Sequence, residues 1–346
     1  MTSLSSLLDI ELPIVQAPMA GVQGSALAIA VSNAGGLGSL PCAMLTVDSL
    51  RSELASIAAG TNKPFNVNFF CHTPPVPDAE RERAWRAALS PYYREFGLDA
   101  SAVPPGAGRA PFSHEAADVL DQIRPAVVSF HFGLPAADLV ARVRAWGSKI
   151  FSSATTVEEA LWLEARGVDG IIAQGLEAGG HRGMFLSADV TTQVGTFALL
   201  PQIVHAVRTP VIAAGGIADA RGVAAALALG ACGVQVGTSY LLCPEATTSA
   251  VHRAALKSPS ARHTALTNLF TGRPALGIVN RLMRDLGPMS SLPPAFPLAT
   301  AAIAPLRAKA ESSGSGDFSP LWAGQNASGC TEAPAAEITL ALAADL

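Results

Sequence analysis

A glycine-rich loop holds the most reactive side chains of this sequence. The stretch AQGLEAGGHRGMF directly follows the apolar segment VDGIIA and spaces four polar side chains between glycines: Gln174, Glu177, His181 and Arg182. Because the unperturbed pKa of histidine is about 6.5, His181 could remove a proton from a bound molecule at neutral pH. Alternatively, His181 is a surface residue that bonds a backbone carbonyl. Arg182 binds an acidic substrate group or pairs with Glu177, and the sequence leaves both open.

Other polar side chains stand near the ends of apolar segments. The amides of Asn68, Gln174 and Gln235 offer donors and acceptors that suit a flat heteroaromatic ring. His131 ends a further segment, where it faces a site or is packed and hydrogen-bonded. His72 follows another segment and is expected only to shape its loop.

Two glycine turns predict a phosphate site. AAGGIAD contains Gly215 and Gly216, and QVGTS contains Gly237 and Thr238. Backbone N–H groups in such turns, together with helix N-termini, bind phosphate. The alternative is that the glycines serve only tight turns. Two such turns at neighbouring strand ends favour phosphate, and phosphate with a ring indicates flavin mononucleotide (FMN).

The charged residues exclude several chemistries. Four lysines are present, of which Lys63 and Lys149 begin strands while Lys257 and Lys309 lie outside the repeat of strands and helices. Without a lysine at a strand end, a Schiff-base mechanism has no nucleophile. No strand end carries a cluster of acids, so metal-assisted enolisation and glycoside hydrolysis are excluded and no metal site is expected. We also expect no Lys or Arg from a strand end to contact the flavin.

Short apolar segments alternate with helical ones along most of the chain. Eight segments are predicted to be strands: residues 13–21, 36–41, 64–70, 126–133, 149–154, 169–175, 209–216 and 232–238. Continuous apolar strands that alternate with helices predict a parallel sheet, and eight such units predict a closed (β/α)8 TIM barrel. An open doubly wound sheet is disfavoured because no GxGxxG follows the first strand. Barrel sites form at the carboxyl ends of the strands.

Two regions do not fit this repeat. We expect residues 1–72 and 125–263 to form the FMN-binding barrel. Residues 73–124 and 264–346 are predicted to form a smaller, mostly helical lid. Alternatively, the C-terminal part is a tail that wraps the barrel. Trp322 is expected to pack within the C-terminal segment and Tyr240 in the core.

Composition and charge limit the location and the partners. The 346 residues are 49% hydrophobic and 14% charged with a net charge of −4, which is typical of a globular protein without a nucleic-acid site. Five scattered cysteines and an N-terminus unlike a signal peptide predict a cytoplasmic protein. Residues 222–244 carry no charge, but glycines interrupt them, so we expect a helix and a strand there rather than a membrane span.

Several blocks of the sequence resemble the class I nitronate monooxygenases, formerly called 2-nitropropane dioxygenases. They are PIVQAPMAG, GGLGSLP, VNFFCH, QGLEAGGHRG, PVIAAGGI and VQVGTSYL, in family order, followed by FSPLWAGQNASG. The resemblance implies FMN-dependent oxidation of alkyl nitronates by O2 to a carbonyl compound and nitrite, with propionate 3-nitronate as one candidate substrate. We expect no membrane or nucleic-acid partner, and a monomer or homodimer.

The resemblance also implies roles for particular residues. His181 is the catalytic residue. The residues implied to bind FMN are Ala17, Pro18, Met19, Asn68, Gln174, Gly179, Gly180, Gly215, Gly216, Gln235, Val236, Gly237 and Thr238.

Three other functions remain as alternatives. An NADPH-dependent flavin enoyl-thioester reductase would share the barrel, and a non-catalytic FMN-binding protein would turn over nothing. A barrel like that of IMP dehydrogenase needs a nucleophilic cysteine. The one candidate soon after the last strand is Cys243, which follows the apolar run SYLL and is expected to be inert.

Overall fold

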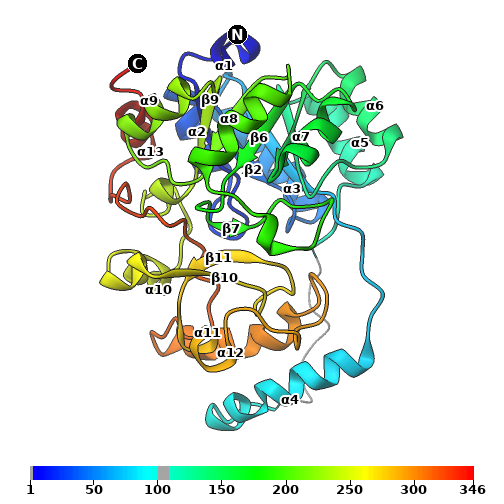
Figure 1. Ribbon diagram of the computed structural model, residues 1–346, viewed down its shortest axis with the longest axis vertical. Helices are drawn as coiled ribbons and strands as arrows, with labels where there is room; N and C mark the ends of the chain where they lie inside the picture. The colour runs from blue at the N-terminus through cyan, green and yellow to red at the C-terminus, as the bar shows by residue number, and fades with distance from the viewer. Residues whose placement is uncertain (1–2, 100–108) are drawn as a thin grey trace.

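Eight parallel strands form a closed barrel in the computed structural model, which describes residues 3–99 and 109–346 (Figure 1). Their order around the barrel is β1 (Ile14–Gln16), β9 (Gly233–Val236), β8 (Val211–Ala214), β6 (Gly170–Gln174), β5 (Lys149–Ala154), β4 (Val127–His131), β3 (Phe65–Phe70) and β2 (Gly38–Pro41). Leu37 closes the circle, since its N–H donates to Ile14 O at 2.8 Å and its carbonyl accepts from Gln16 N at 2.9 Å. The predicted TIM barrel is confirmed.

Helices surround the barrel and cover the outer faces of its strands, nearly all of whose residues are buried. The ring contains α2 (Ser25–Asn33), α3 (Val47–Gly60), α6 (Ala137–Ala145), α7 (Val157–Glu164), α8 (Thr196–Ala206) and α9 (Ala220–Ala228). Thr46 caps α3 as expected, accepting from Ser49 N at 3.2 Å. The short helix α1 (Leu4–Leu8) closes the amino-terminal end of the barrel, where Leu4 N donates to Cys232 O at 3.0 Å.

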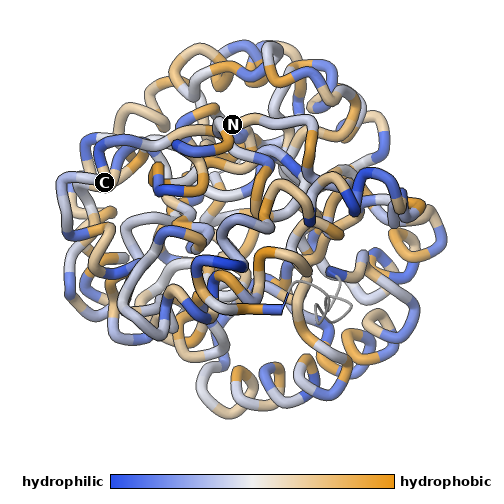
Figure 2. The backbone as a smooth tube through the Cα atoms, turned by 90° about the horizontal axis from the view of Figure 1, so that it is seen from below, coloured by the Kyte–Doolittle hydropathy of each residue, from blue (hydrophilic) through white to orange (hydrophobic). Residues whose placement is uncertain are grey.

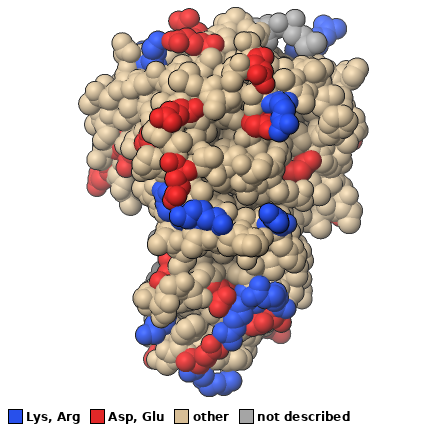
Figure 3. Space-filling model, turned by 90° about the vertical axis from the view of Figure 1, so that its left-hand side faces the viewer, with Lys and Arg blue, Asp and Glu red and all other residues tan. Residues whose placement is uncertain are grey.

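A second unit lies below the barrel in Figure 1, beyond the narrowing visible in Figure 3. Its elements are α4 (Ala79–Glu95), α10 (Ala250–Leu256), the 3-10 helix η4 (Pro259–Arg262), β10 (Thr264–Thr267), β11 (Ala275–Ile278), α11 (Arg281–Leu286) and α12 (Thr300–Ser312). A separate apolar core that includes Trp85, Phe270 and Phe318 holds them together. Hydrogen bonds from Trp85 Nε1 to Ala299 O and from the Tyr93 hydroxyl to Ala302 O join α4 to α12.

Two helices within the expected lid segments belong instead to the barrel. Helix α5 (His114–Ile123) packs against α3 and α6, and α13 (Ala335–Leu342) packs against α2 and α9. Each has an apolar face, such as Ala117 and Leu120 of α5, that the barrel helices bury. The division into two units remains a proposal, and we now place both helices with the barrel. Residues 100–108, within the expected lid segment 73–124, lie outside the described residues.

A three-stranded sheet joins the two units. The strand β7 (Gly180–His181) follows β6 in the barrel, yet it pairs antiparallel with β11 of the second unit, with Ala275 opposite His181. On its other side, β11 pairs with β10. The expectation of a mostly helical unit did not include this sheet, because two residues are too few to show a strand pattern.

The pattern of hydropathy along the helices is the one expected of a globular protein. Viewed from below, the helices alternate between hydrophobic and hydrophilic positions around the molecule (Figure 2). Among the residues that the structure describes, no helix combines the length and the apolar character needed to cross a bilayer. Tyr240, in the short 3-10 helix η3 (Thr238–Tyr240), is fully buried as predicted, and its hydroxyl lies 2.9 Å from Thr339 Oγ1.

Candidate active site

One cavity opens at the carboxyl ends of the barrel strands. It encloses about 1340 Å³ of empty space, its open mouth included. Every residue that the sequence predicted for catalysis or cofactor binding lines it. The structure therefore brings these residues together, while their roles remain predictions.

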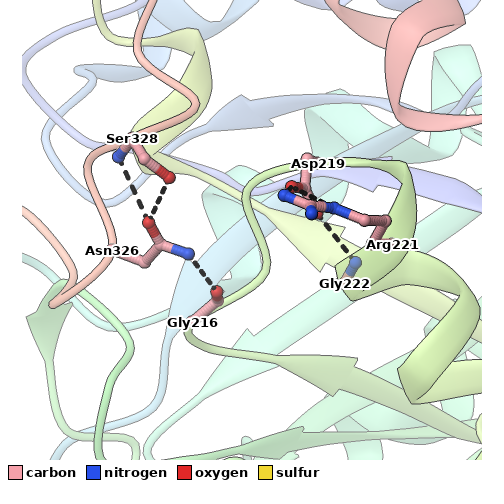
Figure 4. Close-up of polar contacts among 6 residues, drawn as sticks. All are labelled: Gly216, Asp219, Arg221, Gly222, Asn326 and Ser328. Atoms are coloured by element: carbon pink, nitrogen blue, oxygen red, sulfur yellow. Dashed lines mark hydrogen bonds and ion pairs between the residues drawn. The ribbon is translucent and has the colours of Figure 1, made fainter.

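The glycine turn after β8 forms one end of the cavity. Gly215 has a φ of +117° and Gly216 a φ of +74°, values that favour glycine. A Cβ atom on Gly215 would lie 2.8 Å from Thr196 Oγ1 and 3.0 Å from Ala178 N, so no side chain fits there. Asn326 fixes the turn from the C-terminal segment, since its Nδ2 donates to Gly216 O at 2.9 Å (Figure 4).

The N-terminus of α9 is already occupied. The Asp219 carboxylate accepts from Gly222 N at 2.9 Å and pairs with Arg221, so an acidic side chain caps this helix (Figure 4). Helix η3 differs, because Gly237 precedes it without any side-chain cap. The first N–H groups of a helix have no intrahelical acceptor. The glycine turn and the start of η3 therefore have backbone N–H groups that no side chain caps, whereas α9 is capped by Asp219.

The amide side chains at the strand ends differ in how free they are. Gln235 has no side-chain hydrogen bond among the described residues. Asn68 donates its Nδ2 to Ser129 Oγ at 2.9 Å. Both groups of the Gln174 amide are engaged within the loop, Nε2 with His181 O at 3.0 Å and Oε1 with Gly183 N at 2.7 Å. Gln174 thus stabilises the loop, whereas Gln235 can bind a ligand.

His181 lies where the barrel meets the second unit. Its carbonyl accepts from Gln174 Nε2 and from His131 Nε2, the latter at 3.1 Å. Because a carbonyl only accepts, His131 carries its hydrogen on Nε2 and accepts at Nδ1 from Ser153 Oγ, 2.9 Å away. On the other side, His181 Nε2 lies 3.0 Å from Thr271 Oγ1 of the second unit. His131 both faces the cavity and is hydrogen-bonded, so the structure combines the two alternatives that the sequence left open for this residue.

Burial keeps the site histidines neutral. It lowers the pKa of His181 well below the usual value, and the nearby positive charges of Arg109 and Arg273 lower this pKa further. Burial likewise lowers the pKa of His131 to about 3. A neutral imidazole in this cavity can therefore accept a proton at pH 7.

Aromatic rings surround His181. The ring centres of Phe296 and Trp322 lie 5.3 Å and 5.6 Å from that of His181, and Phe70 lies 6.1 Å away. Trp322 packs against Phe270, which agrees with the expected packing role, and it also lines the cavity because the chain returns there. His72 is buried and packs edge-on against Phe296 at 4.8 Å, which agrees with a structural role.

Arg182 has neither of the roles that the sequence left open. Its side chain is fully buried and donates at 2.8 Å to each of three oxygens: Gln174 O, Gly175 O and Gln193 Oε1. Glu177 instead accepts from the backbone N–H and hydroxyl of Thr196 at the start of α8. Both residues hold the loop in place and neither presents its charge to a ligand.

Sequence reasoning missed two titratable side chains that line the cavity. Arg109 lines the cavity, with its guanidinium 5.8 Å from the centre of the Phe296 ring and no ion pair among the described residues. His252 also lines it and is buried, and its Nε2 has no partner in the described part of the chain. Neither residue lies at a strand end, so the barrel pattern could not find them. Cys243 is fully buried, and burial raises its pKa to about 11, so it is the inert thiol that was expected.

Together, the fold and the cavity define a barrel enzyme whose strand ends bring glycine turns and a neutral histidine to one cavity. A family model for nitronate monooxygenase matches residues 1–345. The chain belongs to the nitronate monooxygenase family.

Individual relatives agree with the family model. Nitronate monooxygenase from Pseudomonas aeruginosa is 44% identical over 346 residues, which cover 98% of this chain and 97% of that protein. The solved structure of nitroalkane oxidase from Streptomyces ansochromogenes has a TM-score of 0.90 and 39% identity, covering 100% of this chain and 98% of that one. FabK from Thermotoga maritima is more distant, with a TM-score of 0.70, 26% identity, and coverage of 99% and 95%.

Proposed function

We propose that this chain is a flavin-dependent monooxygenase that oxidises alkyl nitronates with O2 to a carbonyl compound and nitrite. One observation carries the proposal. In a chain of the nitronate monooxygenase family, a single cavity holds both the glycine turns of a phosphate site and the neutral, aromatic-enclosed His181. A monomer or homodimer in the cytoplasm remains the prediction from the sequence.

FMN is the proposed flavin. The turn at Gly215 and Gly216 and the uncapped start of η3 would hold its phosphate, and Gln235 and Asn68 would meet its ring. Two glycines support this fit. A side chain at Gly215 would clash with its neighbours, so its backbone stays bare toward the phosphate. A Cβ on Gly180 would meet nothing within 4 Å, so the space beside it is open to a ligand. A bound flavin supplies the electron transfer between substrate and O2.

The residues around His181 suit an anionic substrate. His181 is neutral, so its free ring nitrogen can accept the α-proton of a neutral nitroalkane. The rings of Phe70, Phe296 and Trp322 keep water away from the reacting carbon and strengthen electrostatic interactions there. Arg109 adds a positive charge to this wall, which supports a substrate with a second anionic group, such as propionate 3-nitronate.

The test combines cofactor identification with turnover. We expect the chromophore released by denaturation to be FMN, and anaerobic mixing with a nitronate to bleach the visible flavin spectrum. Aerobic turnover should then yield nitrite. A protein that binds FMN but is bleached by NADPH and not by nitronates would instead be the reductase, which the more distant likeness to FabK does not favour. A protein that responds to neither would be a non-catalytic FMN binder.

A further inference from the structure

The imidazole of His181 has one side-chain partner, and it comes from the second unit. Nε2 lies 3.0 Å from the hydroxyl oxygen of Thr271, a residue that is only 2% exposed. Nδ1 has no partner among the described residues. Nδ1 is therefore the ring nitrogen that remains for a molecule bound in the cavity that His181 lines.

The orientation of the Thr271 hydroxyl decides which nitrogen of His181 carries hydrogen. Thr271 Oγ1 also lies 3.4 Å from the carbonyl oxygen of Arg273. A carbonyl only accepts, so a hydroxyl that donates to Arg273 O has its lone pairs free for an Nε2–H donor. The opposite orientation would donate to Nε2, place the hydrogen on Nδ1 and leave Nδ1 unable to accept a proton.

Proton transfer distinguishes these two orientations. Once Nδ1 has taken a proton, the imidazolium carries hydrogen on both nitrogens, so Nε2 must donate. Only a Thr271 hydroxyl that points at Arg273 O can accept from Nε2 both before and after the transfer. That orientation needs no rearrangement during the reaction, which is the arrangement expected of a preorganised site.

We propose that Thr271 is a positioning residue that holds His181 in the tautomer with hydrogen on Nε2, so that Nδ1 takes the substrate proton. The inference rests on the proposed function, within which it assigns the accepting atom. The ring itself is located independently, because Gln174 and His131 hold the His181 carbonyl and β11 pairs with its backbone. A change at Thr271 should therefore alter the tautomer more than the position of the ring.

The direct test is the tautomeric state of His181, measured by NMR with ¹⁵N-labelled histidine rings on the full chain with and without FMN. A His181→Asn variant assigns the signal among the seven histidines. We expect the wild-type protein at pH 7 to carry hydrogen on Nε2. Thr271→Val, which keeps the shape and removes the hydroxyl, should produce a mixture of tautomers, while Thr271→Ser should match the wild type. A wild-type signal with hydrogen on Nδ1, or a Val variant that matches the wild type, would overturn the inference.

Kinetics provide a second readout. An ordinary hydrogen bond corresponds to roughly a two- to tenfold change in an equilibrium. Thr271→Val should therefore lower kcat/KM for a neutral nitroalkane up to about tenfold, with nitronate turnover within about twofold of the wild type. Equal losses on both substrates would contradict the assignment. If the wild type oxidises no nitronate at all, the proposed function fails, whereas the NMR result still decides the role of Thr271.

Discussion

Replacing Arg182 with methionine tests what holds the glycine loop. Methionine has a similar length and no donor, so three buried oxygens would lose their hydrogen bonds: Gln174 O, Gly175 O and Gln193 Oε1. Each buried group left without a partner costs about 1–3 kcal/mol. Three such groups together cost at least about 3 kcal/mol, and a single substitution seldom costs more than about 5 kcal/mol. We therefore expect the free energy of unfolding to fall by about 3–5 kcal/mol, a large part of the 5–15 kcal/mol typical of folded proteins.

Urea denaturation of the protein without cofactor measures this loss. Arg221→Met is the matched control, because Arg221 is 88% exposed and pairs only with Asp219 of its own turn. An exposed pair contributes at most about 1 kcal/mol, so this variant should stay close to the wild type. Should Arg182→Met unfold like the control while its KM for nitronates rises, Arg182 would be a substrate-binding residue and the reasoning would be refuted.

Three further predictions concern the cavity. His181→Asn should reduce any turnover of neutral nitroalkanes by about 10²–10⁴-fold while retaining much of the nitronate turnover, since a nitronate has already lost its proton. Equal losses on both substrates with unchanged flavin content would show that His181 is not the proton acceptor. Gly215→Asp should lower flavin content, because its side chain would clash with Thr196 and bring a negative charge to the proposed phosphate site. The control is Gly314→Asp, which is strained by a φ of +76° but is remote from the cavity and should keep its flavin content. Burial lowers the pKa of His252 to about 4, so the unfolded chain binds more protons at this residue between about pH 4 and 6.5. This group alone should cost the protein about 1–2 kcal/mol of stability from pH 7 to pH 5. His252→Phe should remove that part of the decline, and parallel stability profiles for the two proteins would disprove it.

The barrel was predictable because its signals are local. Each strand is a short apolar run bounded by glycine or a helix, as in residues 209–216. The helices that cover the strands are likewise recognised from the local pattern of apolar residues. The glycine turns could be placed together because consecutive parallel strands lie side by side with their carboxyl ends at one edge. Gly215 and Gly237 therefore line one cavity, although they are well separated in the chain.

The rest of the site depends on contacts between distant segments, which leave no local pattern. Arg182 looks like any loop arginine in the sequence, and only the folded loop shows its burial. Trp322 and Arg109 reach the cavity, and Thr271 reaches His181, from the second unit or its connections, where neither strand ends nor spacing mark them. For the same reason, α5 and α13 were assigned to the lid, since a helical pattern shows an apolar face but not the surface that buries it.

The pairing of β7 with β11 also bears on how the protein is made. As the chain leaves the ribosome, the last barrel strand, β9, is complete at Val236, before any residue of β11 exists. Until Ala275 and its neighbours have emerged, Gly180 and His181 have no strand partner. The histidine therefore takes up its final geometry late in synthesis, after the framework around it is complete. Asn326, which fixes the glycine turn, emerges later still, so the C-terminal segment completes both ends of the cavity.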